Sequence, residues 1–184
     1  MARICFTLML KSDHHIIFQF PARWIDKAKE LRIKDDQTLG DQMFESDHRW
    51  AGKIGEWAFY SVFPDMRSVN SWDRKGKHDF ISSKTDLRYE VKTNSADRAF
   101  EDSFHFNVND TQHKKNPSDI YVACYYMPGS PFIRLCGWLY KPQVNTRGVL
   151  IRKGESLSNK GNVAKSDFWK VPFASLNSMH FMPE

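Results

Sequence analysis

An acid and a lysine stand two residues apart in the stretch Arg88-Tyr89-Glu90-Val91-Lys92-Thr93, which has the composition of a β-strand. Side chains of a strand alternate between its two faces, so Glu90 and Lys92 point one way and Tyr89 and Val91 point the other way, into a core. A carboxylate beside an ammonium group on one face is costly to bury. The same pair is suited to metal-assisted hydrolysis, which becomes the working hypothesis for the chain.

A second acid, Asp79, opens the strand predicted to precede this one, and ten residues separate it from Glu90. If the two strands are neighbours, both carboxylates converge, and a hard divalent cation relieves their repulsion. Mg²⁺ takes one or two carboxylates together with waters and substrate phosphate. We therefore predict Asp79, Glu90, the carbonyl of Val91 and a further acid, Glu56, as metal ligands. Lys92 would orient the attacking water or stabilise charge on the phosphorane-like transition state.

The elements that must position these residues follow from the pattern of apolar and turn residues. A helix is predicted from an N-cap at Ser46 or Asp47 to about Phe63, with Pro64 as its stop. Gly52 and Gly55 lower its helix propensity, and they make sense if the helix packs closely against a sheet or DNA. Strands are expected over 68–72, 78–82 and 87–93, with a turn at 83–86.

The remaining segments predict a mixed α/β layer design with a central sheet. The nearly continuous apolar run Ile120 to Tyr126 indicates a central strand that is covered on both faces. The other expected elements are a hairpin of strands 2–10 and 15–20, a helix over 21–33, a loop over 34–46, a polar region with a possible short helix over 94–116, a strand over 132–140, a polar segment over 141–167, a strand over 168–173 and a terminal turn or helix over 174–179.

Composition favours one domain of 184 residues with a packed core, since 41% of its residues are hydrophobic. The net charge of +5 favours a polyanionic partner. Three cysteines without a C-x-x-C pair argue against a disulfide scaffold or a zinc site. No stretch approaches the length of a membrane span, so we expect no membrane partner and a soluble, intracellular protein, cytoplasmic or nucleoid-associated.

These residues together resemble the PD-(D/E)XK nuclease superfamily, also called restriction-endonuclease-like, over roughly residues 46–140. The resemblance is carried by Glu56 in a Gly-x-x-Gly-Glu helix, by Asp79, and by Glu90-Val91-Lys92. It extends to Gln112 in the following polar segment, to Asp119 opening an apolar strand, and to the strand containing Gly137-Trp138. His78 stands where the family name expects proline, a position that varies within the family.

The resemblance implies a restriction-endonuclease-like core, with a central mixed β-sheet flanked by helices. The segments outside it, an expected N-terminal hairpin and helix elaboration over 1–45 and a basic C-terminal extension over 141–184, would complete a single domain. It implies a Mg²⁺-dependent DNA endonuclease, with Mn²⁺ as a possible substitute and a homodimer as a possible assembly. Asp79 and Glu90 would be metal ligands, Lys92 the catalytic lysine, Glu56 a helix acid and Gln112 an auxiliary group. Two alternatives are a catalytically inactive nucleic-acid-binding module of the same fold and an RNA-directed nuclease. The side chains expected to contact nucleic acid are Lys75, Lys77, Asn94, Lys114 and Lys115.

Overall fold

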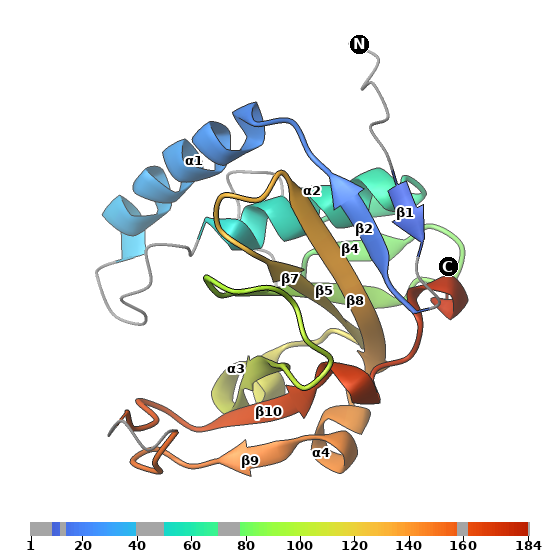
Figure 1. Ribbon diagram of the computed structural model, residues 1–184. Coiled ribbons are helices and arrows are strands. Elements are labelled where there is room, and N and C mark those ends of the chain that lie inside the picture. Colours follow the sequence, from blue (N-terminus) through green and yellow to red (C-terminus); the bar gives the residue numbers. More distant parts are fainter. Residues whose placement is uncertain (1–8, 12–13, 40–49, 70–77, 158–161, 184) are drawn as a thin grey trace.

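The structure is a computed structural model, and it describes residues 9–11, 14–39, 50–69, 78–157 and 162–183 (Figure 1). Within these ranges the chain is an α/β protein built around a mixed, curled seven-stranded sheet of order β1-β2-β8-β7-β5-β4-β3. Parallel pairing joins β5 to β7, and the other neighbours are antiparallel. The strands are β1 (Met9–Lys11), β2 (Ile16–Gln19), β3 (Met66–Ser68), β4 (Phe80–Ser82), β5 (Arg88–Ser95), β7 (Ile120–Tyr126) and β8 (Phe132–Tyr140).

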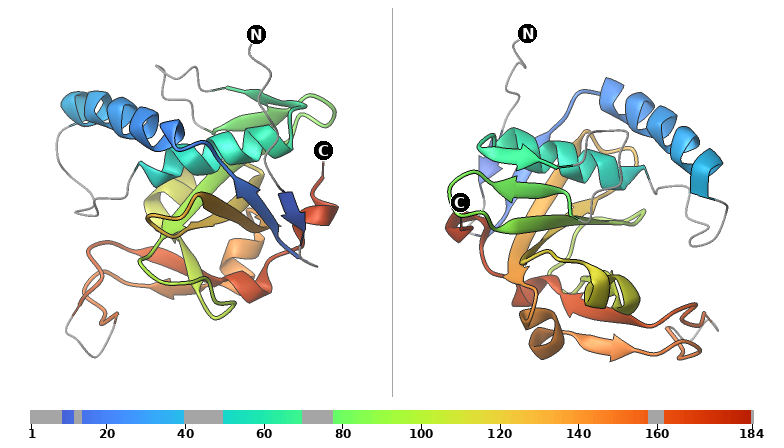
Figure 2. Two further views of the ribbon diagram at one scale, coloured as in Figure 1. Left: turned by 45° about the horizontal axis from the view of Figure 1, so that its top comes forward. Right: turned by 180° about the vertical axis from the view of Figure 1, so that it is seen from behind.

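A helical layer covers one face of this sheet, and a small second sheet covers the other (Figures 1 and 2). The helices of the first layer are α1 (Arg23–Leu39) and α2 (Ala51–Val62), of which α2 packs directly on β5. The second sheet has the order β6-β10-β9. It comprises β6 (His105–Asn109), β9 (Val149–Ile151) and β10 (Phe168–Pro172), and the remaining short helices are α3 (Asp110–Lys115), α4 (Gln143–Arg147), η1 (Phe173–Ser175) and η2 (Met179–Phe181).

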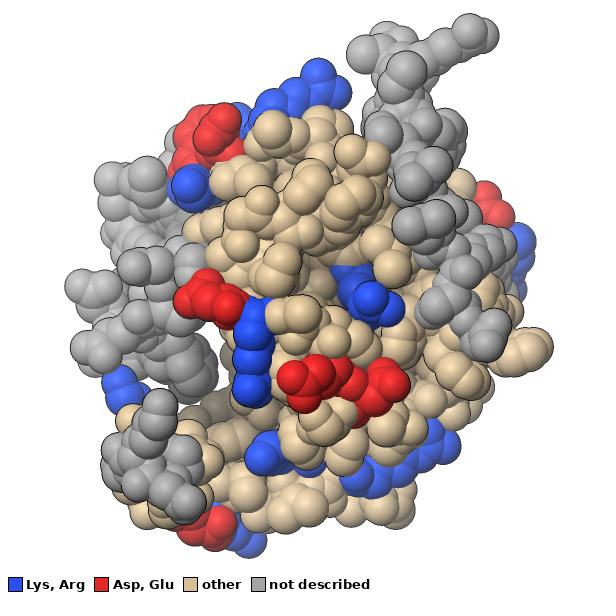
Figure 3. Space-filling model, in the orientation of Figure 1, with Lys and Arg blue, Asp and Glu red and all other residues tan. Residues whose placement is uncertain are grey.

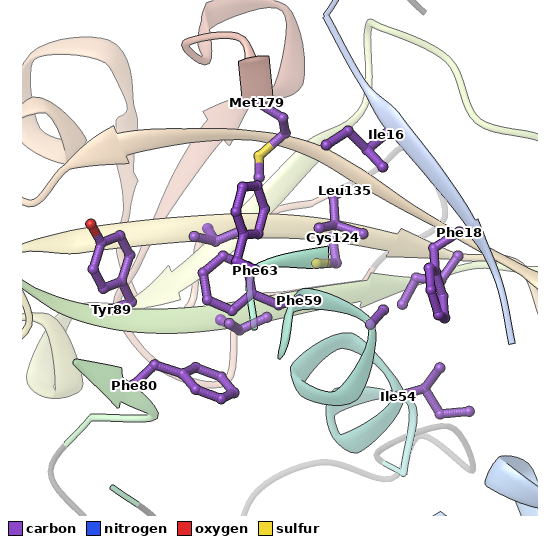
Figure 4. Packing of buried hydrophobic residues seen from close by; sticks show 14 of the residues in the cluster. Ile16, Phe18, Ile54, Phe59, Phe63, Phe80, Tyr89, Cys124, Leu135 and Met179 are labelled. Carbon is purple, nitrogen blue, oxygen red and sulfur yellow. The ribbon is translucent and has the colours of Figure 1, made fainter. Parts of the chain in front are cut away.

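Strand β7 is the predicted doubly covered strand, and every one of its residues is buried. Because successive side chains of a strand point to opposite faces, the residues of β7 alternate between two hydrophobic cores. Val122 and Cys124 pack toward α2 in the first core, which Figure 4 shows between the helix and the strands. Tyr121 and Ala123 belong to the second core, which β6 and β10 close from the other side. The two layers therefore meet on a central strand whose sequence is apolar on both faces.

Several expected elements are confirmed. The N-terminal hairpin forms from antiparallel β1 and β2, and residues 2–8 of its first expected strand lie outside the described part of the chain. The strand expected over 132–140 is β8. The strand expected over 78–82 is shortened to β4, and the one expected over 87–93 continues to Ser95 as β5. The strand expected over 68–72 instead lies at Met66–Ser68 as β3, and residues 70–77 are outside the described part of the chain.

Other expectations are wrong at their boundaries. The helix expected over 21–33 begins at Arg23 and runs to Leu39, so residues 34–39 are helical where a loop was expected. These six residues contain no glycine or proline to break the helix, and residues 40–46 of the expected loop lie outside the described part of the chain. Helix α2 runs from Ala51 to Val62, and the N-cap expected at Ser46 or Asp47 lies outside the described residues. The segment 94–116 contains β6 as well as the short helix, and the segment 141–167 contains α4 and β9. No helix in the described ranges has the length and apolar composition needed to cross a membrane.

Candidate active site

Strand β5 has the alternation expected from its sequence. Tyr89 is fully buried and Val91 nearly so, both in the core beneath α2. Glu90 and Lys92 point to the other face of the sheet. Their register partners on the parallel neighbour β7 are Tyr121 and Ala123. Lys92 Nζ donates to Glu90 Oε1 at 2.5 Å, and the exposed fractions of the two side chains are 25% and 13%. The lysine and the acid therefore form a partly buried ion pair on one face of the strand.

Asp79 lies beside this pair, at the point where β4 leaves β5. Strand β4 pairs with β5 only at Phe80 and Ile81. One residue earlier, Asp79 Oδ2 accepts a hydrogen bond of 2.8 Å from the amide of Val91, the residue between Glu90 and Lys92. The Asp79 carboxylate thus accepts the hydrogen bond that a backbone carbonyl of a neighbouring strand would otherwise accept from the Val91 amide. This hydrogen bond holds Asp79 against the Glu-x-Lys segment of β5.

Glu56 approaches the same point from α2, and the electrostatics show the convergence. Burial raises the pKa of Asp79 well above its ordinary value, and the negative charges of Glu56 and Glu90 raise it further. Burial also raises the pKa of Glu56, and Glu90 adds to this rise, while Lys53 and Lys92 oppose it. The three carboxylates predicted from the sequence therefore crowd one another, although they come from a helix, the start of one strand and the middle of the next.

The packing of α2 on β5 explains how a helix residue reaches this point. A Cβ atom on Gly55 would collide with Oγ1 of Thr93 and lie 3.6 Å from Cβ of Cys124. The helix can approach the strand this closely only because position 55 has no side chain. Strand β4 pairs with β5 only at Arg88 and Tyr89, and no described strand pairs with this edge of β5 beyond them. Glu56, which follows Gly55 on the helix, can therefore reach this open edge of the sheet. Gly52 was expected to pack in the same way, but its position is open.

Lys53 is a site residue that the sequence reasoning missed. Its ammonium group donates to both carboxylate oxygens of Glu56, at 3.0 and 3.2 Å. The signal in the sequence was the spacing of three residues on one helix, which places the two side chains side by side. Lys53 thus pairs with Glu56, and Lys92 pairs with Glu90, so each of these two acids of the cluster has an ammonium group beside it.

The donor set fits a hard divalent cation in its chemistry, because all of its side-chain ligands are carboxylate oxygens. In the described part of the chain, no three acidic, histidine or cysteine side chains are arranged to hold a metal ion by themselves. Mg²⁺ requires only one or two carboxylates when waters and substrate phosphate complete its shell. The carbonyl of Val91 stays a prediction as a ligand, since the contact that the structure places at Val91 is made by its amide.

Histidine 78 precedes Asp79 and has a distinctive environment. Both ring nitrogens are buried without a hydrogen-bond partner. Burial lowers the pKa of the imidazole, and the nearby guanidinium group of Arg88 lowers it further. Asp119, which the resemblance placed at the start of β7, holds Arg88 through two side-chain hydrogen bonds of 2.8 Å. This ion pair ties the start of β5 to the start of β7, so Asp119 has a structural role.

The remaining predicted residues lie elsewhere. Gln112 is on α3, which packs on β6 and β10, and it takes no part in the interactions that join the carboxylates. Asn94 donates to the carbonyl of His105 at 2.6 Å and so connects β5 to β6. Lys114 pairs with Asp110 at 2.7 Å, and Lys115 is exposed on the same helix. Lys75 and Lys77 lie outside the described residues.

Basic and acidic side chains are interspersed on the face of the molecule seen in Figure 3, which has no continuous basic band among its described residues. Charge on that face gives no separate indication of a nucleic-acid surface. In comparisons with known proteins, no protein-family model matches the chain, and no curated protein shows significant similarity to it.

Proposed function

We propose that this chain is a Mg²⁺-dependent DNA endonuclease with a restriction-endonuclease-like core. The observation that carries the proposal is the convergence of Glu56, Asp79 and Glu90 beside Lys92. A carboxylate cluster that raises the pKa of its own members is costly to stability, and such clusters are concentrated at functional sites. A nucleic-acid-binding module would gain nothing from carboxylates that repel phosphate.

Each residue has a role that follows from its position. Asp79 and Glu90 would hold the metal ion, and Glu56 would contribute through its effect on both or through a water. A bound divalent ion would lower the pKa of coordinated water and polarise the scissile phosphate.

Lys92 lies at the rim of this set, where it is 25% exposed and already oriented by Glu90. From there its ammonium group can turn toward a substrate phosphate, because the chain is flexible and the charge is a compact point donor. It would orient the attacking water and stabilise negative charge in the transition state. Lys53 would hold Glu56 in place, as it does in the structure.

The test is cleavage of supercoiled plasmid DNA with Mg²⁺ or Mn²⁺, comparing the wild-type protein with Lys92→Ala and Glu90→Ala. We expect the wild type to nick or linearise the plasmid and both variants to lose at least about 100-fold in rate, as expected for removal of a group that stabilises the transition state. Lys170→Ala is the matched control, because Lys170 lies in β10 of the second sheet. A wild type that binds DNA in a salt-dependent way without cutting it would contradict the proposal and support the binding module.

A further inference from the structure

A groove of about 710 Å³ is lined by residues of α1 and α2. Three aromatic residues line it: Trp24, Trp57 and Tyr60. The ring of Trp24 meets that of Trp57 edge to face, with ring centroids 5.4 Å apart. Tyr60 is 45% exposed, so part of its ring surface is open to solvent. The groove thus offers π-faces to a ligand.

Tyr60 connects the lining of the groove to elements of the candidate active site. Tyr60 follows Glu56 by one turn of α2. Its ring stacks in parallel on the ring of Phe80, at an interplanar angle of 9°, and Phe80 directly follows Asp79. A strand of nucleic acid whose phosphate lies at the carboxylates would therefore bring a neighbouring nucleotide to Tyr60.

The charged residues among those described in the groove lining are both basic, Arg23 and Lys27. Lys27 pairs with Glu30 at 3.0 Å, which leaves the guanidinium group of Arg23 as the main positive charge at the rim. Aromatic faces that accept bases, combined with a cation that accepts phosphate, are the features of single-stranded nucleic-acid sites. A base in a duplex cannot reach such faces, because its own faces are stacked on neighbouring bases.

We propose that this groove binds an unpaired base of the DNA substrate, so that the enzyme acts on DNA with a single-stranded segment next to the cleaved bond. This inference rests on the proposed nuclease function for the cleavage it describes, but its binding step does not. The experiment therefore measures binding and cleavage separately.

Binding is measured by fluorescence anisotropy in EDTA, with a labelled oligothymidylate and a labelled hairpin duplex as the two probes. We expect Tyr60→Ala to weaken binding of the oligothymidylate by about 5- to 150-fold, which is the effect of losing one stacked base, and to change duplex binding by less than about 2-fold. Tyr60→Phe keeps the ring and should bind like the wild type. Tyr140→Ala is the matched control, since Tyr140 is a 40% exposed tyrosine on β8 outside the groove.

Equal weakening of both probes by Tyr60→Ala, or no weakening of either, would overturn the inference. A wild-type dimer that Tyr60→Ala dissociates, with oligothymidylate binding unchanged, would also overturn it and would assign the groove to a second copy of the chain.

Cleavage is then compared on a forked and a fully paired duplex with Mn²⁺. Preference for the fork that Tyr60→Ala removes is the expected result, and equal cleavage of both by the wild type would overturn the inference while leaving the nuclease proposal intact. Selective oligothymidylate binding without any cleavage would leave the groove assignment standing and refute the nuclease proposal.

Discussion

Replacing Gly55 with alanine tests how closely α2 must approach β5 to bring Glu56 to the other carboxylates. Alanine in place of glycine inside a helix is worth up to about 1 kcal/mol in helix propensity. Against this gain, the new Cβ collides with Thr93 Oγ1, and the β-branched Thr93 cannot easily rotate away. Overpacking of this kind costs about 1 to 3 kcal/mol. We therefore expect Gly55→Ala to lower the free energy of unfolding by up to about 2 kcal/mol.

Two further variants isolate the collision. Gly52→Ala lies on the same helix with nothing within 4 Å, so it should raise the free energy of unfolding by up to about 1 kcal/mol. Thr93→Ala removes the colliding hydroxyl, which has no hydrogen-bond partner in the folded protein. In a Thr93→Ala background, Gly55→Ala should then be neutral or stabilising, which a double-mutant cycle reports as a favourable coupling between the two changes.

The assay is urea unfolding followed by tryptophan fluorescence, with the midpoint and slope fitted for each variant. The sign of the Gly55→Ala effect should depend on residue 93. If Gly55→Ala is as stable as Gly52→Ala, or if its cost is the same with alanine at position 93, then the close approach of α2 to β5 does not limit the fold and the positioning argument is wrong.

Three further outcomes are expected. Asp79→Asn should abolish metal-dependent cleavage yet raise the thermal midpoint in EDTA, because an amide oxygen can still accept from the Val91 amide while a crowded charge is removed; a lower midpoint would show that the charge itself stabilises the fold. Because Arg88 holds the pKa of Asp119 below 3.8, this pair contributes stability above pH 3.8 that is lost as the pH falls further. In Asp119→Asn, the decrease in stability between pH 5 and 2.5, measured by urea midpoints, should therefore be smaller than in the wild type. Burial lowers the pKa of His113 below 6.5, so protons bind this imidazole more readily in the unfolded chain, and the stability of the wild type should decrease as the pH falls below 6.5. In His113→Gln this decrease, measured by urea midpoints, should be less steep, and identical slopes for the two proteins would contradict the prediction.

The strand that carries the chemistry could be predicted from the sequence because its signal is local. Alternation places Glu90 and Lys92 on one face, and the apolar run of β7 marks a strand buried on both sides. The second sheet could not be predicted in the same way. Strands β6 and β9 are five and three residues long, and they are stabilised by pairing with β10, which is distant in sequence.

The convergence of the acids needs tertiary information. The contact of Asp79 with the Val91 amide depends on where β4 begins. The approach of Glu56 to the edge of β5 depends on the tight contact at Gly55. The sequence suggested that contact through an otherwise unfavourable helix glycine, but it suggested Gly52 equally, and only the packing distinguishes the two. Lys53 was missed because a lysine three residues from an acid on a helix is ordinarily a surface pair.

The most direct test of the metal site is anomalous scattering from crystals of the wild-type protein grown with Mn²⁺. We predict one strong peak within coordination distance of the Asp79 and Glu90 carboxylates, and its loss in crystals of Asp79→Asn. A peak that persists unchanged in that variant, or full Mn²⁺ occupancy elsewhere with none at these two acids, would contradict the assignment of this carboxylate cluster as a metal-dependent active site.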